Sequence, residues 1–396
     1  MPFYHTLGQI PHKRHTAFRK PNGGIYAEQL MGHEGFTGTS ALLYHVHPPT
    51  TVKQVTRLRE LKYEADPDHT LKHRHFRTSQ FTPGGSPTLD RTPLLFNADI
   101  TMLYAEPTLQ DDHFYRNAQG DEVVYVSKGS GTLETQFGTL PFHEGDYLVI
   151  HRGIMHRYRL DAGVQPKLLI FESRGHVRTP KRYRNEFGQI KEGAPYCERD
   201  IRIPRELQTF DEKGDFRILV KQYNGLNEYI LDHHPLDVVG WDGYFYPWAF
   251  NINDFEPIVG RVHQPPPVHQ TFEGDGFVIC SFCPRPYDFD PNAVPAPYNH
   301  SNVDSDEVLY YASSEFMSRK GIEFGSITHH PDGIPHGPHP GRAEASIGAK
   351  GTDELAVMMD SFRPLKVARA ALPLEDPSYH RSWLDVQHEA FNPPTS

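Results

Sequence analysis

The segment Asp112–Tyr158 reads DHFYRNAQGDEVVYVSKGSGTLETQFGTLPFHEGDYLVIHRGIMHRY and is the strongest indication of the fold. Its apolar runs, Val123–Val126 and Tyr147–Ile150, have the length and composition of β-strands. Glycines at positions 129, 131, 138 and 145 interrupt the segment at the spacing of hairpin turns. The segment therefore predicts a series of short antiparallel strands.

A second segment, residues 298–345, repeats this pattern. The pair Asp306-Glu307 stands directly before the apolar run Val308–Tyr311, as another Asp-Glu pair stands before the first run of the earlier segment. The order of acidic pair, strand, glycine turn and late histidine resembles that of the cupin family. The resemblance implies a bicupin, with two jelly-roll β-barrel modules in one chain.

Composition favours a mainly β fold with few helices. The chain has 396 residues, enough for two modules, and its 35 prolines and 32 glycines are typical of a protein with many turns. We expect residues 1–90 to be a lead-in that wraps the first module, and residues 91–160 to form that module, with a structural role. Residues 161–235 then serve as linker and connecting strands, and residues 236–396 hold the second, metal-binding module and the C-terminal segment. The charged stretch 55–66 is expected to be an exposed helix or loop.

Charge and targeting signals restrict the partners. A net charge of −10 argues against binding to nucleic acid. No apolar stretch reaches the length of a transmembrane helix, and the N-terminus lacks a signal-peptide pattern. The small, odd number of cysteines fits a reducing compartment. We expect a cytoplasmic protein with no membrane partner, in which Cys280 and Cys283 are buried free thiols because they lie in an apolar strand.

Three side chains in the second segment form a candidate metal centre: His300, Glu307 and His336. Two imidazoles and one carboxylate bind one face of a metal ion and leave the other positions open, which suits non-haem Fe(II). The same ligands admit Mn, Ni, Zn or Cu. In the first module, His113, Glu122 and His156 form a weaker candidate for a second set, and we expect that module to be structural.

Further motifs resemble the homogentisate 1,2-dioxygenase family. They occur in the same order along both and span most of the chain: Tyr26–Leu30, Asp237–Gly243, the Tyr298-x-His300 pair with Glu307, the His330-x5-His336-Gly-Pro string, and Tyr379–Trp383.

By this resemblance His300, Glu307 and His336 are the iron ligands, and His330 lies beside the substrate. The spacing departs from the family, because its histidine and glutamate are normally one residue closer. Asp306 has the family spacing, but we prefer Glu307 because it directly precedes the apolar strand.

The resemblance also implies residues that contact the substrate. The catalytic base falls on His269, or on His263 if the gap in the alignment is placed differently. Tyr298 lines the pocket, and a cationic side chain, Arg319 or Lys320, holds a substrate carboxylate.

The expected activity is Fe(II)-dependent, extradiol-type ring cleavage by molecular oxygen. The small aromatic substrate is homogentisate, giving maleylacetoacetate in tyrosine and phenylalanine catabolism, or a close dihydroxy-aromatic analogue. The resemblance further implies a homo-oligomer, either a trimer or a dimer of trimers. Two alternatives remain open: a bicupin decarboxylase or isomerase that uses another divalent metal, and a non-catalytic bicupin that binds a small molecule.

Overall fold

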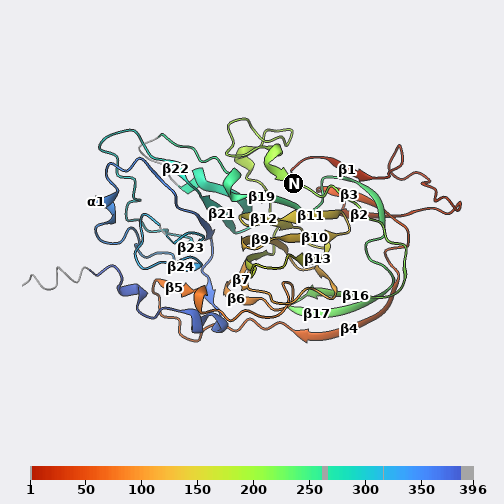
Figure 1. Ribbon diagram of the computed structural model, residues 1–396, viewed down its shortest axis with the longest axis horizontal. Coiled ribbons are helices and arrows are strands. Elements are labelled where there is room, and N and C mark those ends of the chain that lie inside the picture. Colours follow the sequence, from red (N-terminus) through yellow and green to blue (C-terminus); the bar gives the residue numbers. More distant parts are fainter. Residues whose placement is uncertain (1, 261–265, 315, 385–396) are drawn as a thin grey trace, which may run out of the picture. The chain divides into compact units, whose positions relative to one another are not determined.

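The structure, a computed structural model, describes residues 2–260, 266–314 and 316–384. Its contacts divide the chain into two compact units, each built mainly from strands (Figure 1). Unit 1 contains the residues up to Glu64, Thr82–Leu94 and Ala98–Asp254; unit 2 contains Ala65–Phe81, Leu95–Asn97 and the residues from Phe255 onward.

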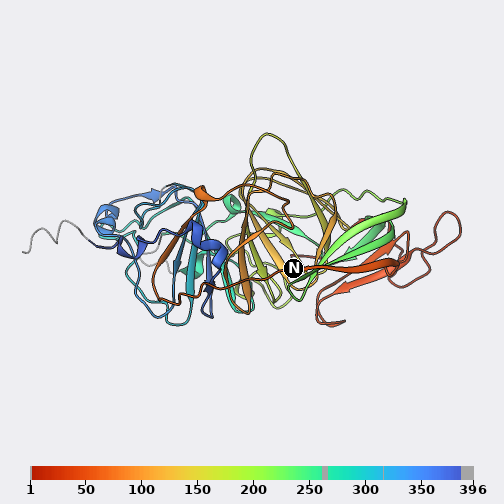
Figure 2. The ribbon, with the colours of Figure 1, turned by 90° about the horizontal axis from the view of Figure 1, so that it is seen from below.

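The largest sheet confined to unit 1 has seven strands, in the order β11-β10-β13-β8-β16-β17-β4. Their bounds are β11 Gly138–Phe142, β10 Gly131–Thr135, β13 Met155–Leu160, β8 Phe114–Asn117, β16 Lys213–Gln222, β17 Gly225–His233 and β4 Val52–Glu60. Strands β16, β17 and β4 lie side by side (Figure 2). Strand β4 is exposed along its whole length at the edge of the sheet.

A second sheet of unit 1 contains the order β15-β19-β12-β9-β14-β7. These strands are β15 Ile201–Arg202, β19 Trp248–Asn251, β12 Asp146–Ile150, β9 Asp121–Lys128, β14 Lys167–Ser173 and β7 Ile100–Ala105. Side chains on both faces of β9 and β12 are buried, which explains why their apolar residues follow one another without alternation. Each fully buried large apolar side chain contributes roughly 1.5–3 kcal/mol to folding.

The register of this second sheet brings three strand ends together. Ile150, the last residue of β12, lies opposite Glu122, and Ser173, the last residue of β14, lies opposite Asp121. The start of β9 therefore lies between the ends of β12 and β14. A third, four-stranded sheet in the order β1-β18-β3-β2 completes unit 1, with β1 His5–Gly8, β18 Val238–Gly243, β3 Ser40–His45 and β2 Ala27–Gly32.

Unit 2 is organised around a six-stranded sheet in the order β20-β21-β26-β23-β24-β5. Its strands are β20 Gln270–Gly274, β21 Phe277–Phe282, β26 Ala356–Ser361, β23 Asp306–Tyr311, β24 Ser326–His330 and β5 Arg74–Arg77. Strand β23 is buried throughout and lies between β26 and β24, with Glu307 opposite Asp360 on one side and His330 on the other. The remaining pairs are short: β22 Arg285–Pro286 with β25 Gly351–Thr352, and β27 Lys366–Val367 with the end of β6 Thr92–Phe96.

Helices are few and short. The described residues contain one α-helix, α1 Arg342–Ser346, and 3₁₀ turns at Thr78–Gln80, Lys181–Tyr183, Glu198–Asp200, Ile252–Asp254, Pro266–His269, Arg369–Leu374 and Tyr379–Arg381. In the described part of the chain, no helix has the length and apolarity needed to cross a membrane.

The prediction of a mainly β, jelly-roll fold with few helices is confirmed. Among the described strands the sheets are open, jelly-roll-like layers, not the closed barrels that the sequence suggested. The expectation of a helix or loop at residues 55–66 is wrong for its first half, which belongs to β4, because pairing with the distant strand β17 fixes an extended backbone there. Cys280 and Cys283 are buried free thiols, as predicted.

Candidate metal centre

The structure brings His300, Glu307 and His336 together, with one possible ligand atom of each within 4.8 Å of the others. Glu307 is the second residue of β23, whereas the two histidines lie in loops before β23 and after β24. Each histidine donates its backbone N–H to the other's carbonyl oxygen, at 2.8 Å in both directions. This isolated bridge sets the two imidazoles side by side, with ring centroids 4.3 Å apart.

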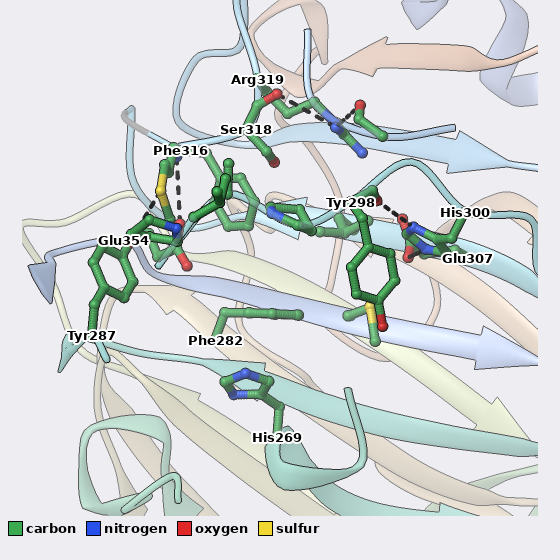
Figure 3. A pocket seen from close by; sticks show the side chains of 18 of the residues that line it. His269, Phe282, Tyr287, Tyr298, His300, Glu307, Phe316, Ser318, Arg319 and Glu354 are labelled. Atoms are coloured by element: carbon green, nitrogen blue, oxygen red, sulfur yellow. Dashed lines mark hydrogen bonds and ion pairs between the residues drawn. The ribbon is translucent and has the colours of Figure 1, made fainter. Parts of the chain in front are cut away.

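The ring nitrogens of this group are arranged as in a site that takes a cation. His300 donates Nδ1–H to the carbonyl oxygen of Tyr298 at 3.1 Å, so its Nε2 lone pair is left facing Glu307 Oε2 at 3.8 Å (Figure 3). Both ring nitrogens of His336 are buried without a hydrogen-bond partner, and its Nε2 lies 3.5 Å from Glu307 Oε1. Buried polar atoms are normally satisfied, so these orphaned nitrogens fit a metal ion.

Glu307, and not Asp306, faces the two histidines. Successive residues of a strand point to opposite faces. The Asp306 carboxylate accepts hydrogen bonds from His329 Nε2 at 2.9 Å and from the backbone N–H of Asp332 and Leu365 at 2.9 and 2.8 Å. Asp306 is therefore occupied on the other side of β23.

His330 is directly behind Glu307. It is fully buried, and its Nδ1 donates to Glu307 Oε1 at 2.8 Å. Burial alone would raise the pKa of Glu307, but the three imidazoles around it, those of His300, His330 and His336, hold that pKa well below its usual value. Burial also lowers the pKa of His330, against the opposing effect of Glu307. A neutral histidine thus orients an ionised carboxylate.

A cavity of about 440 Å³ opens beside this group and is lined in part by His300 and Glu307 (Figure 3). Its apolar lining includes Phe282, Leu309, Phe316 and Met358, and its polar lining includes His269, Arg285, Arg319 and Glu354. The volume is within the range of small-molecule sites.

Of the two candidate bases, His269 and His263, the structure describes only His269. His269 is buried, lines the cavity and stacks on Phe282 at 4.5 Å between ring centroids. In Figure 3 it lies across Phe282 from His300 and Glu307. Burial, helped by the charge of Arg285, lowers the pKa of His269 to about 3, and its Nδ1 has no hydrogen-bond partner. His263 lies outside the described residues.

Of the three residues predicted to contact the substrate, two line the cavity and one does not. Tyr298 lines the cavity and is 60% exposed. Arg319 also lines it, buried, with one guanidinium nitrogen donating to the Gly337 carbonyl oxygen. Lys320 is exposed, and its Nζ donates to the Pro340 carbonyl oxygen at 2.6 Å instead of lining the cavity.

Sequence reasoning missed Arg285. This residue lines the cavity, and its Nη2 pairs with Glu354 Oε1 at 2.8 Å. An isolated Arg-Pro dipeptide after a strand carries no signal by which Arg285 stands out from other arginines in the sequence.

The first module holds no comparable group at His113, Glu122 and His156. Glu122 instead pairs with Arg91 at 2.8 Å, and His113 is 3.0 Å from the hydroxyl of Thr88. Among the described residues, these two histidines and the glutamate do not form a group with ligand atoms in common reach. The guanidinium of Arg91 supplies the positive charge beside Glu122.

Comparison with known proteins shows the family of this chain. A sequence model for the N-terminal part of homogentisate 1,2-dioxygenase matches residues 5–252, more than half of the chain. The chain belongs to the homogentisate 1,2-dioxygenase family. It is 42% identical, over 97% of its length and 99% of the other protein's, to a Saccharolobus solfataricus protein named "Putative dioxygenase SSO1533".

More distant members carry the family name itself. The homogentisate 1,2-dioxygenase of Nitrobacter hamburgensis is 27% identical over 67% of this chain and 60% of its own. Among solved structures, a cupin 2 conserved barrel domain protein from Leptotrichia buccalis aligns with 77% of this chain and 100% of its own, at 11% identity and a TM-score of 0.32. Membership of a dioxygenase family makes the chain an enzyme of the oxidoreductase class.

Proposed function

We propose that this protein is an Fe(II)-dependent dioxygenase that cleaves the aromatic ring of homogentisate or of a close dihydroxy-aromatic analogue. The observation that carries the proposal is the joining of a 2-His-1-carboxylate group, His300, Glu307 and His336, to a cavity of about 440 Å³. The balanced reaction adds both atoms of one O₂ to the ring carbons and breaks one ring C–C bond, which converts homogentisate to maleylacetoacetate.

The three side chains would hold the iron on one face and leave the opposite positions open. Bound there, Fe(II) would act as a Lewis acid and would relay electrons from the aromatic diol to triplet oxygen. His330 keeps Glu307 in its ligand orientation through the Nδ1–H···Oε1 bond of 2.8 Å. Outer partners of this kind support metal affinity.

The cavity accommodates an aromatic ring that bears an acidic side chain. Phe282, Leu309 and Met358 offer an apolar lining for the ring. The guanidinium of Arg319, whose Nε is buried without a hydrogen-bond partner, binds the substrate carboxylate. The charge of Arg285 is already matched by Glu354, so Arg319 is the cation available to an anionic substrate.

His269 is the candidate base in this scheme. Its pKa of about 3 keeps the imidazole neutral at physiological pH, so its unpartnered Nδ1 can accept a hydrogen bond from a phenolic hydroxyl of the bound ring. Transfer of the proton to this weak base would require the phenol's own pKa to be lowered by binding to the metal. The stacked ring of Phe282 keeps the imidazole in place and excludes water from one of its faces.

Oxygen consumption tests the proposal. The purified chain is reconstituted anaerobically with Fe(II), and uptake is followed at an oxygen electrode with homogentisate, gentisate and hydroquinone. We expect one O₂ per homogentisate, and loss of turnover in His300→Ala and His336→Ala. The exposed His12 provides the matched control, His12→Ala, which should keep wild-type turnover.

The outcomes separate the substrate from the reaction. Uptake with a different diol alone would retain ring cleavage and replace homogentisate as the substrate. No uptake with any diol by a fully iron-loaded protein would overturn the dioxygenase proposal and favour a bicupin decarboxylase or isomerase.

A further inference from the structure

Unit 1 contains a second group of possible metal ligands, far in sequence from the first. His33, Asp121, His151 and His176 each place one ligand atom within 4.8 Å of the others. His33 follows β2, Asp121 begins β9, His151 follows β12 and His176 comes after β14. The register that brings the start of β9 between the ends of β12 and β14 explains how three of them meet.

Asp121 is the centre of this group. It is almost fully buried, and its Oδ2 lies 2.7 Å from His151 Nδ1 and 3.0 Å from His176 Nδ1. Backbone N–H groups of Arg152 and Val177 donate to the same carboxylate at 2.8 and 3.0 Å. The carboxylate is thereby fixed in place and carries its negative charge among neutral donors.

His151 is not a ligand but holds the carboxylate in position. Its Nδ1–H donates to Asp121, and its Nε2 accepts the indole N–H of Trp248 at 3.2 Å. A neutral imidazole has one proton, so a metal on Nδ1 would leave an N–H on Nε2 facing the indole N–H. Both nitrogens of His151 are therefore already committed.

The rings of His33 and His176 pack against each other with their planes tilted by 48° and their centroids 3.8 Å apart. His176 donates Nδ1–H to Asp121, as His151 does, which leaves the lone pair of its Nε2 for a metal ion. His33 Nε2 is buried with no hydrogen-bond partner. Both residues are partly exposed, so an ion has a path from solvent. The lone pair of His33 Nε2, the Asp121 carboxylate and the His176 imidazole are therefore arranged to coordinate a cation.

We propose that His33, Asp121 and His176 bind a divalent cation of the zinc class, with His151 as a positioning residue for Asp121. Imidazole and carboxylate ligands suit Zn²⁺, which commonly has three protein ligands and one water where the site opens to solvent. Bound there, the ion links three segments of unit 1. The proposal does not depend on the proposed ring-cleavage activity.

Metal binding is measured on the full-length chain with the other candidate site removed. In a His300→Ala/His336→Ala background, the metal-free protein is titrated with Co²⁺ as a spectroscopic substitute for Zn²⁺, and Zn²⁺ content is determined after dialysis. We expect one ion per chain, with the visible absorption of a four-coordinate site. Adding His33→Ala and His176→Ala should weaken binding beyond the roughly 10- to 100-fold that loss of an outer partner costs.

Controls separate ligation from folding. His12→Ala/His69→Ala removes two exposed histidines and should leave the affinity unchanged. Asp121→Asn keeps the shape of the side chain and one acceptor oxygen but replaces the other oxygen with an NH₂ group and removes the negative charge, and it should also weaken binding. The proposal is overturned if the background chain binds no ion, or if it still binds one with unchanged affinity after loss of His33 and His176.

Discussion

The ion pair between Arg91 and Glu122 makes the structural role of the first module testable. The Glu122 side chain is fully buried and that of Arg91 is 6% exposed, with 2.8 Å between Nη1 and Oε2. Asn117 is the other side chain that donates to this carboxylate, at 2.9 Å. Arg91→Met keeps an unbranched apolar stem but removes the guanidinium and its charge, which leaves Glu122 as a buried carboxylate without a cationic partner.

The pKa of Glu122 gives the magnitude. Burial alone would raise this pKa, but Arg91 and lesser contributions hold it at about 2, against the usual 4.5. At about 1.36 kcal/mol per pH unit, the difference corresponds to roughly 3 kcal/mol of stability. Because the folded-state pKa is depressed, this stability is present above pH 4.5 and is lost as the pH falls through 2. Breaking a buried pair by removing one partner typically costs about 3–5 kcal/mol.

Unfolding of unit 1 can be followed selectively. Two of the three tryptophans, Trp241 and Trp248, are fully buried in this unit. In a Trp383→Phe background, their fluorescence during urea unfolding at pH 7 reports unit 1 alone. We expect Arg91→Met to lower the free energy of unfolding by about 3 kcal/mol or more.

Two comparisons make the result decisive. Arg91→Met/Glu122→Gln removes both charges and should recover part of the loss, whereas Arg182→Met, at an exposed arginine, should cost less than about 0.5 kcal/mol. A loss below about 1 kcal/mol for Arg91→Met would refute the reasoning, because Glu122 would then not depend on Arg91 for its charge.

Three further outcomes are expected. His330→Ala removes the donor to Glu307 Oε1 and should weaken Fe(II) binding by about 10- to 100-fold, with His330→Asn less affected; equal iron affinity in wild type and His330→Ala would count against this role. The depressed pKa of His269, about 3, should keep its imidazole neutral from pH 5 to 8, so an NMR titration that finds it protonating near pH 6.5 would contradict the structure. Burial lowers the pKa of His75 and of His339 to about 4. As the pH falls from 6.5 to 4, the unfolded chain binds protons at these histidines before the folded chain does, so the free energy of unfolding should fall by up to about 1.4 kcal/mol per pH unit for each histidine. Urea midpoints that do not change over this range would contradict the lowered pKa values.

Local pattern was enough to predict the hairpins of the first module. The apolar runs Val123–Val126 and Tyr147–Ile150 lie within β9 and β12, which pair with each other across a short stretch of sequence. The grouping of His300, Glu307 and His336 was also predictable, since the acidic residue opens a strand and the late histidine follows the next strand.

Features that depend on distant pairing were not predictable. Strand β4 is fully exposed and charged, and only its ladder with β17 makes it extended. The group around Asp121 draws His33, His151 and His176 from separate strand ends, so no spacing in the sequence relates them. The partnership of Arg91 with Glu122 likewise gave no signal, because a single arginine in a loop has no characteristic pattern.

The pairing of strand β5 limits which fragments of the protein can be expressed on their own. Its residues, Arg74–Arg77, pair with β24 through Ser326–His329, although some 250 positions separate the two strands. A gene fragment that starts at Phe255 would therefore encode unit 2 without its edge strand and would expose the backbone of β24, the strand that ends at His330. During synthesis on the ribosome, residues 74–77 cannot pair with β24 until nearly the whole chain has emerged. Expression of the fragment from Phe255 onward is expected to give aggregates, and circular permutation that joins residues 65–81 to that fragment is the rational route to an isolated unit 2.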